Sequence, residues 1–163
     1  MDYVALQRSW DNSDPRHGGD YLKSGLVNEI DDAQVNAIVD GFEADPFRAT
    51  TFFYQQSGGA INRVSESATA FPNRNAVNGP AVVVAWNEGA DPEPHIRYIR
   101  SYFSDIEKFT NGFYTNTGEY ETQASVNRNY RGNYQRLVAL KDRYDPGNLF
   151  RLNVNVQPSQ PKA

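Results

Sequence analysis

The end of the chain constrains the fold more than any other stretch, because residues 129–156 read as a helix, a turn and a short strand in direct succession. Lys141 and Arg143 lie in the last turn of the expected helix at 129–144, where cations oppose the negative end of the helix dipole. Pro146 then stops the helix and Gly147 permits the turn.

Alternation in residues 151–156 predicts that the strand has one apolar and one polar face. The polar face carries Arg151, Asn153 and Asn155, and the apolar face carries Leu152, Val154 and Val156. Two amides on one strand face form a suitable rim for a polar ring, although short polar strands near a terminus are also often solvated edges.

Periodicity predicts further helices at 32–44, with Asp31 as N-cap, and at 93–110. The apolar stripe of the first comprises Val35, Ile38, Val39 and Phe42. Strands are expected at Tyr3–Leu6, Thr50–Gln56, Ala81–Trp86 and Gly112–Asn116, and polar loops at 9–25 and 64–80. Because 81–86 is apolar on both faces, we place it centrally. The pattern predicts an α+β fold, an antiparallel sheet with helices packed on one face.

Composition favours one globular domain, which we place at residues 1–157, followed by a frayed tail at 158–163. A net charge of −4 argues against nucleic acid and anionic membranes as partners. We expect a cytoplasmic protein, because the chain has no Cys, no signal-like start and no membrane-spanning stretch. His17 and His95 are expected to be solvated, so no metal site is predicted.

Several motifs in this order resemble the berberine bridge enzyme-like family of FAD-linked oxidases. They include GGDYLKSG at 18–25, GGAINRVSESATAFPNR at 58–74, the strand AVVVAW at 81–86 and FYTNT at 113–117. The ending, NYRGNYQRL at 129–137 and YDPGNLFRLNVN at 144–155, completes the pattern. The resemblance covers nearly the whole chain and corresponds to the family's C-terminal substrate domain.

The resemblance implies that one open sheet face roofs a flavin and holds a small organic substrate. We expect this face to be rich in Phe, Tyr and Trp, and to be covered by a flavin-binding subunit or in a homodimer. The family's pyrophosphate loop lies before the region that this chain resembles, and Gly58-Gly59 is a weak phosphate signal. FAD is therefore expected to act through a partner subunit, with none tightly bound by this chain alone.

By the same resemblance, Tyr130 and Tyr134 are the candidate catalytic residues, and Asn133, Asn153 and Asn155 are the candidate cofactor-binding residues. The two tyrosines are four apart and would share one helix face. A tyrosine acts as a base only if its pKa of about 10 is lowered, and the expected cause is Arg128, Arg131 or Arg136. The structural alternative places Tyr134 in the core and Tyr130 as a surface cover.

Three departures from the family's pattern bear on activity. Arg131 stands where the family has a small residue, and the strand at 79–84 has no polar side chain to aim at a substrate. Asn73 replaces the His of the motif FPHR, while Arg74 is expected to hold its loop by charge-assisted hydrogen bonds.

Three functions remain open on the sequence. The first is a substrate domain that works with a separate flavin-bearing subunit on a polyketide-, alkaloid- or sugar-like molecule. The second is a flavin-independent binding protein or catalyst that uses the same aromatic pocket. The third is a remnant without activity, so whether the chain is an enzyme is left undecided.

Overall fold

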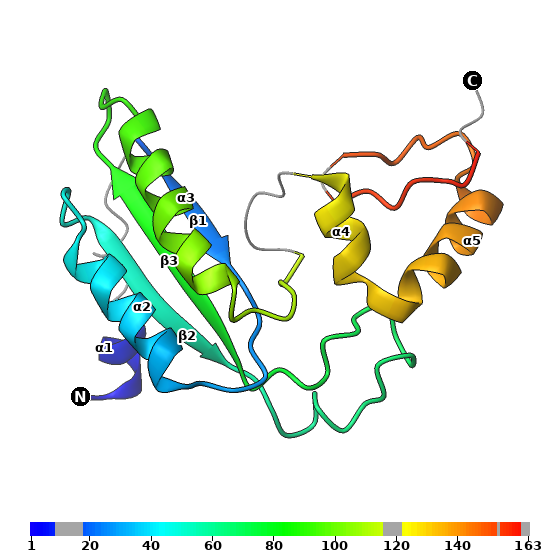
Figure 1. Ribbon diagram of the computed structural model, residues 1–163, viewed down its shortest axis with the longest axis horizontal. Helices are drawn as coiled ribbons and strands as arrows, with labels where there is room; N and C mark the ends of the chain where they lie inside the picture. The colour runs from blue at the N-terminus through cyan, green and yellow to red at the C-terminus, as the bar shows by residue number, and fades with distance from the viewer. Residues whose placement is uncertain (9–17, 116–121, 153, 161–163) are drawn as a thin grey trace.

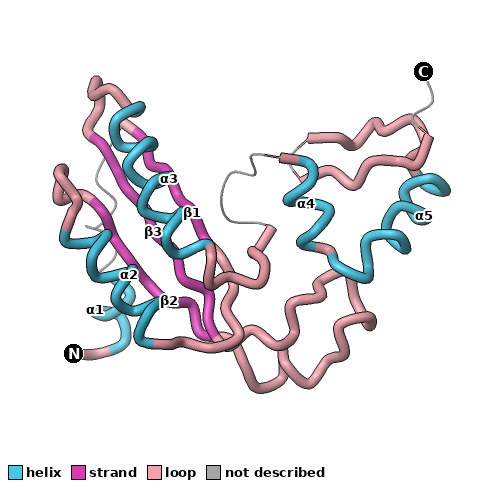
Figure 2. The backbone as a smooth tube through the Cα atoms, viewed as in Figure 1, coloured by secondary structure: helices cyan, strands magenta, loops and turns pink. Residues whose placement is uncertain are grey.

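The computed structural model describes residues 1–8, 18–115, 122–152 and 154–160 (Figure 1). Its elements are, in order, α1 (Tyr3–Arg8), β1 (Gly19–Ser24), α2 (Asp32–Glu43), β2 (Thr50–Gln56), β3 (Asn78–Trp86), α3 (Glu93–Glu107), α4 (Gln123–Asn129), the 3₁₀ turn η1 (Arg131–Asn133) and α5 (Tyr134–Tyr144). Figure 2 shows the sheet with α2 and α3 on one side of the molecule, and α4 with α5 on the other. None of the described helices is both long and apolar enough to cross a membrane.

The sheet is antiparallel in the order β1-β3-β2, with helices on one face, so the predicted α+β class is confirmed. β3 is central, as its apolar residues on both faces predicted, and β2 has the predicted bounds. Tyr21 of β1, Val82 and Val84 of β3 point to the helix side and form the core with Ile38, Ile99, Tyr102, Phe103 and Ile106.

Helix α2 begins as expected, because Asp31 Oδ1 accepts a hydrogen bond from the backbone N–H of Gln34 at 2.7 Å. The expected apolar stripe is wrong in part. Ile38 is buried, but Val35, Val39 and Phe42 are 41%, 45% and 45% exposed. The helix is turned so that Gly41 meets α3, where an added Cβ would lie 2.1 Å from the Tyr102 ring.

Two strand predictions are wrong. Residues 3–6 form helix α1, whose first turn is capped by Asp2 Oδ1 accepting from Ala5 N at 2.9 Å. Residues 112–115 form no strand, and Gly112 makes a single antiparallel bridge to Leu26, while Asn116 lies outside the described residues. Conversely, β1 lies within the expected loop at 9–25, because Tyr21 can be buried under α3 and the ladder to β3 overrides its Gly and Lys.

The expected helix at 129–144 is also shorter than predicted. Arg131 has a left-handed φ of +47°, and this residue separates α4 from α5. Among the described residues of 151–156 there is no strand, and Asn153 lies outside them. Instead, Asp145 accepts hydrogen bonds from the N–H groups of Leu149 and Phe150 and folds the segment back on α5.

The end of the described chain is held against α5. Ser159 donates its N–H and its hydroxyl hydrogen to the carboxylate of Asp142, both at 2.8 Å. Residues 158–160 therefore have a definite attachment, and the domain boundary at 157 stays a prediction.

Candidate functional site

The open face of the sheet, opposite α2 and α3, is lined by small residues on its central strand. In the register of the sheet, Val83 of β3 lies between Leu22 of β1 and Thr51 of β2. Ala81 of β3 likewise lies between Ser24 of β1 and Phe53 of β2. The expectation of a face rich in Phe, Tyr and Trp is wrong. Strand alternation turns Phe52, Tyr54 and Trp86 to the helix side, where they pack against the core.

A small depression of about 30 Å³ lies on this open face. It is lined by Leu22, Ser24, Gly25, Leu26, Phe53, Gln55, Gly79, Ala81 and Tyr114. The ring of Tyr114 meets that of Phe71 edge to face at 6.2 Å, which links the depression to the loop at 58–74. Its volume suits one water or one small group of a larger ligand.

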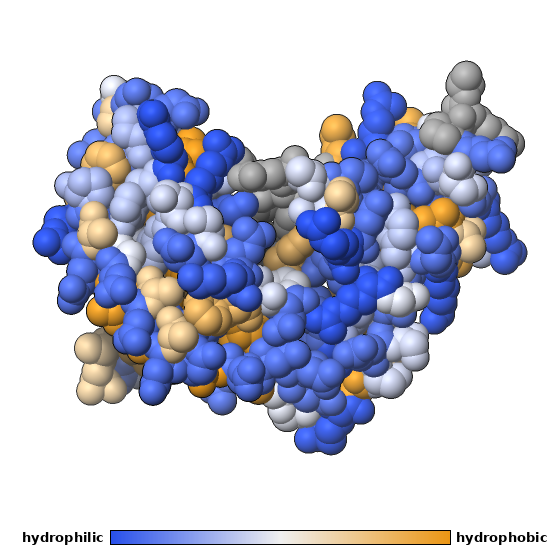
Figure 3. Space-filling model, viewed as in Figure 1, coloured by the Kyte–Doolittle hydropathy of each residue, from blue (hydrophilic) through white to orange (hydrophobic). Residues whose placement is uncertain are grey.

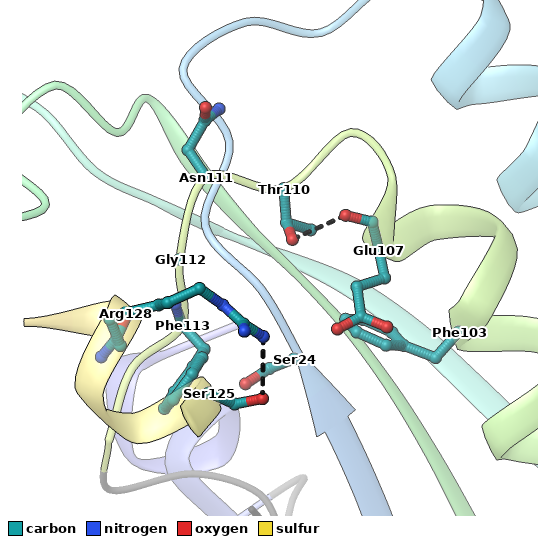
Figure 4. Close-up of a pocket in the computed structure, with 10 residues that line it drawn as sticks. Ser24, Phe103, Glu107, Thr110, Asn111, Gly112, Phe113, Ser125 and Arg128 are labelled. Carbon is teal, nitrogen blue, oxygen red and sulfur yellow. Dashed lines mark hydrogen bonds between the residues drawn. The ribbon is translucent and has the colours of Figure 1, made fainter. Parts of the chain in front are cut away.

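A larger cavity of about 330 Å³ lies where the end of β1, the end of α3 and helix α4 meet (Figure 4). The aromatic rings of Phe103 and Phe113 form part of the cavity wall. Glu107 of α3 and Arg128 of α4 place a negative and a positive charge in the same lining. Arg128 Nη2 donates to Ser125 Oγ at 3.3 Å, and no ion pair joins Arg128 to Glu107. The volume and the mixed lining suit a small organic ligand with polar groups.

Sequence motifs do not indicate this cavity, because its residues come from three separate stretches of the chain. The sequence singles out Arg128 only as a neighbour of Tyr130, and none of the motifs includes Glu107. Their helical positions alone carry no signal that α3 and α4 end at the same place. Such proximity follows from the fold.

Tyr130 is half-buried as the C-cap of α4, and burial raises the pKa of its phenol above the ordinary value. The expectation that a neighbouring arginine lowers it is wrong for this residue. Arg131 donates to the carbonyl of Asn111 at 2.6 Å, and Arg136 donates to that of Ser67 at 3.2 Å. The phenol of Tyr130 is thus neutral near pH 7, and its catalytic role stays a prediction.

Asn133 lies between Tyr130 and Tyr134 and ties the turn to the loop at 58–74. Its side-chain Nδ2 donates to the carbonyls of Glu66 at 2.7 Å and Thr69 at 3.0 Å. The amide is buried, while Tyr134 is half-buried at the start of α5. The two tyrosines therefore do not share one helix face, because η1 separates them.

Asn155 lies against α4, where its backbone carbonyl accepts from Gln123 Nε2 at 2.7 Å. Its side-chain Oδ1 is buried and has no hydrogen-bond partner in the described part of the chain. A buried acceptor without a donor is costly to the folded state. Asn153, the other predicted amide, lies outside the described residues.

Two residues of the FPHR-like motif hold the loop at 58–74 in place: Arg74, which matches the motif, and Asn73, which replaces its His. Arg74 donates to the carbonyls of Phe71 and Ile61 and to the hydroxyl of Thr69, so its predicted holding role is confirmed. Asn73 is buried and donates to Asn129 Oδ1 at 3.3 Å. That oxygen also accepts from Phe113 N at 2.9 Å, which joins the loop, α4 and the segment after α3.

The Gly58-Gly59 pair does not have the geometry of a pyrophosphate-binding loop. Gly58 and Gly59 lie in a turn that leads into no helix, so no helix N-terminus is presented to a pyrophosphate. No group of three or more metal-ligating side chains occurs in the described ranges. His95, expected to be solvated, is half-buried and stacks on Phe47 at 4.1 Å.

Residues 113–157 match a family model described as "Berberine and berberine like". Over 135 residues the chain is 27% identical to an uncharacterized FAD-linked oxidoreductase, YgaK, of Bacillus subtilis (strain 168), which covers 83% of this chain and 30% of that protein. The chain thus spans about a third of the length of such relatives.

Solved structures share the fold over most of the chain. BBE-like 1 of Physcomitrella patens superposes with a TM-score of 0.73 at 24% identity, covering 91% of this chain and 33% of that one. Aclacinomycin oxidoreductase superposes with a TM-score of 0.75 at 22% identity, covering 94% and 36%.

Proposed function

Because the chain carries the berberine and berberine-like region and is related over most of its length to FAD-linked oxidoreductases, we propose that it is the substrate-side domain of such an oxidoreductase. In this proposal it works with a separate flavin-bearing subunit. The described residues bring a sheet face and a cavity but no pyrophosphate cradle, and the isoalloxazine ring would come from that subunit.

The observation that carries the proposal is the sheet with one face covered by α2 and α3 and the other face open. The open face is smooth, since β3 contributes Ala81 and Val83 there, and it suits contact with a flat ring. The 330 Å³ cavity at the end of β1 lies next to this face and supplies charged and aromatic groups for a small organic substrate. The substrates proposed for this cavity are of polyketide, alkaloid or sugar type.

The alternative function is a flavin-independent binding protein or catalyst. The feature that favours it is the same cavity, because Arg128 and Glu107 could orient a polar ligand without a flavin. The open face of β3, by contrast, offers no polar side chain to a substrate that is being oxidised at a flavin.

Turnover of a substrate panel separates the two functions. Polyketides, alkaloids and oligosaccharides are incubated aerobically with the chain alone, with a flavoprotein fraction of the host, and with both. We expect oxidation that requires both components and falls with Arg128→Leu but not with Lys108→Leu, an exposed control on α3's end. Turnover by the chain alone would contradict the proposal and support the alternative.

A further inference from the structure

The cavity of about 330 Å³ between α3 and α4 holds a carboxylate that its own helix disfavours. Glu107 is the last residue of α3, and the last turn of this helix contains no basic residue. A negative charge at that end opposes the helix dipole, which favours cations there. Support of the helix therefore does not explain why Glu107 is a carboxylate.

No cation neutralises Glu107 in the part of the chain that the structure describes. The neighbouring Lys108 lies with its Nζ 4.0 Å from Asp105 Oδ1, and the hydrogen bond of the Arg128 guanidinium goes to Ser125. Figure 4 shows the side chains of Glu107 and Arg128 reaching toward each other from α3 and from α4. A ligand in the cavity would thus lie between two opposite charges.

The α3 side of the cavity combines this carboxylate with an aromatic ring. Phe103 precedes Glu107 by one helical turn, so both side chains face the cavity from one helix face. Aromatic faces attract cations, and a carboxylate adds a charged hydrogen-bond acceptor. The α3 side therefore suits a protonated amine.

The α4 side offers hydrogen-bond donors instead. Asn129 lines the cavity beside Arg128 and is only 4% exposed. Its Oδ1 accepts hydrogen bonds from Asn73 Nδ2 and from Phe113 N, and the backbone donor identifies this atom as the oxygen. Its Nδ2 makes no hydrogen bond to any described residue, which is costly for a buried donor. An amide N–H next to a guanidinium suits a carboxylate.

The surroundings of the cavity also favour a charged ligand over an apolar one. On the face that Figure 3 shows, apolar colour gathers at the α2 end of the molecule, whereas the α4–α5 end is mostly hydrophilic. Arg128 would repel an amine and Glu107 would repel a carboxylate, so the two charges fix the direction in which such a ligand lies.

We propose that this cavity binds a small organic molecule that carries both a protonated amine and a carboxylate. The amine lies at Glu107 and Phe103, and the carboxylate lies at Arg128 and Asn129. This assignment rests on the proposed function, in which the cavity holds the substrate, and it narrows that substrate to molecules with both groups.

Isothermal titration calorimetry on the chain alone tests the assignment with three probes that share one ring. The compound para-aminomethylbenzoate carries both groups, benzylamine carries only the amine, and benzoate carries only the carboxylate. We expect para-aminomethylbenzoate to bind about fivefold or more tightly than either of the others. Straight-chain ω-amino acids of increasing length should show one optimum, set by the spacing of the two subsites.

Single substitutions separate the two ends of the cavity. Glu107→Gln should weaken the binding of para-aminomethylbenzoate and benzylamine by about fivefold, without weakening that of benzoate and without lowering the melting temperature. Arg128→Gln should weaken the binding of para-aminomethylbenzoate and benzoate instead. Asp105→Asn is the matched control, because it removes an exposed carboxylate at the same helix end that does not line the cavity.

The absence of binding by all probes, a preference for benzoate over para-aminomethylbenzoate, or equal effects of Glu107→Gln and Asp105→Asn would overturn the assignment. These measurements contain no flavoprotein, so they are independent of the proposed oxidation. Binding of para-aminomethylbenzoate by a chain that supports no turnover with the flavoprotein fraction would contradict the oxidoreductase and still support this ligand class.

Discussion

Tyr130 closes α4 as its C-cap and Tyr134 opens α5, and Arg131 between them has a φ of +47°. This left-handed geometry costs an L-residue about 1–2 kcal/mol, which glycine does not incur. Arg131 offsets part of that cost through its hydrogen bond to Asn111 and its ion pair with Glu66 at 3.7 Å.

Replacement of Arg131 should separate the strain from the contacts. Arg131→Gly and Arg131→Ala both remove the contacts, but glycine alone relieves the left-handed strain. We expect the free energy of unfolding of the glycine variant to exceed that of the alanine variant by about 1 kcal/mol in denaturant titrations. Equal stabilities would show that residue 131 is not held in the left-handed region.

The raised pKa of Tyr130 predicts a specific alkaline behaviour. Burial favours the neutral phenol in the folded chain, so the folded pKa exceeds the unfolded value of about 10. The stability from this residue is complete below pH 10 and is lost as the pH rises through the folded pKa. Tyr130→Phe should therefore lose less stability than the original chain between pH 9 and pH 11, and an identical loss in both would contradict the assignment.

The same variant tests the predicted catalytic role. Tyr130→Phe and Tyr134→Phe are compared for turnover with the flavin-bearing fraction and for melting temperature. Reduced turnover at an unchanged melting temperature supports a site at these tyrosines. Reduced stability with unchanged turnover supports the structural alternative and ends the catalytic assignment.

Asp45 anchors the loop between α2 and β2, since its buried carboxylate accepts from the N–H groups of Phe47, Ala49 and Thr50, each at 2.9 Å. Burial acts to raise its pKa, but these hydrogen bonds outweigh burial and lower it. Asp45→Asn should cost about 1–3 kcal/mol of stability near neutral pH. The difference from the original chain should shrink as the pH falls through the folded pKa, whereas the exposed Asp40→Asn should have little effect throughout.

Gly112 lies against the side-chain amides of Asn73 and Asn129, whose hydrogen bond joins the loop at 58–74 to α4. A Cβ there would meet Asn73 Oδ1 at 2.6 Å and Asn129 Oδ1 at 2.9 Å. We expect Gly112→Ala to destabilise the chain by about 1–3 kcal/mol in thermal or chemical unfolding. Gly132→Ala, whose Cβ would meet nothing within 4 Å, is the control, and equal effects of the two would contradict this packing.

Local signals predicted several elements well. Asp31 marked the start of α2, alternation in 50–56 gave β2, and the apolar run at 81–86 gave the central strand. Tertiary contacts decided what local patterns could not. The close approach of Gly41 to Tyr102 turned the buried face of α2, and the left-handed Arg131 divided the last helical stretch.

The candidate site was less predictable from the sequence. Motifs singled out the turn around Tyr130 and Asn133, but the cavity depends on where α3 and α4 end. Glu107 and Arg128 are separated by 20 intervening residues, six of which lie outside the described ranges. Spacing in the chain therefore gives no indication that both side chains line one cavity.

The visible absorption spectrum of the tagged chain, purified under native conditions from its host, tests the central claim most directly. We predict a yellow complex whose flavin follows a second polypeptide when the two are separated, while the chain alone is colourless even after incubation with FAD. A stoichiometric flavin that stays with the chain alone, or a chain that co-purifies with no flavoprotein, would contradict a substrate-side domain served by a separate flavin-bearing subunit.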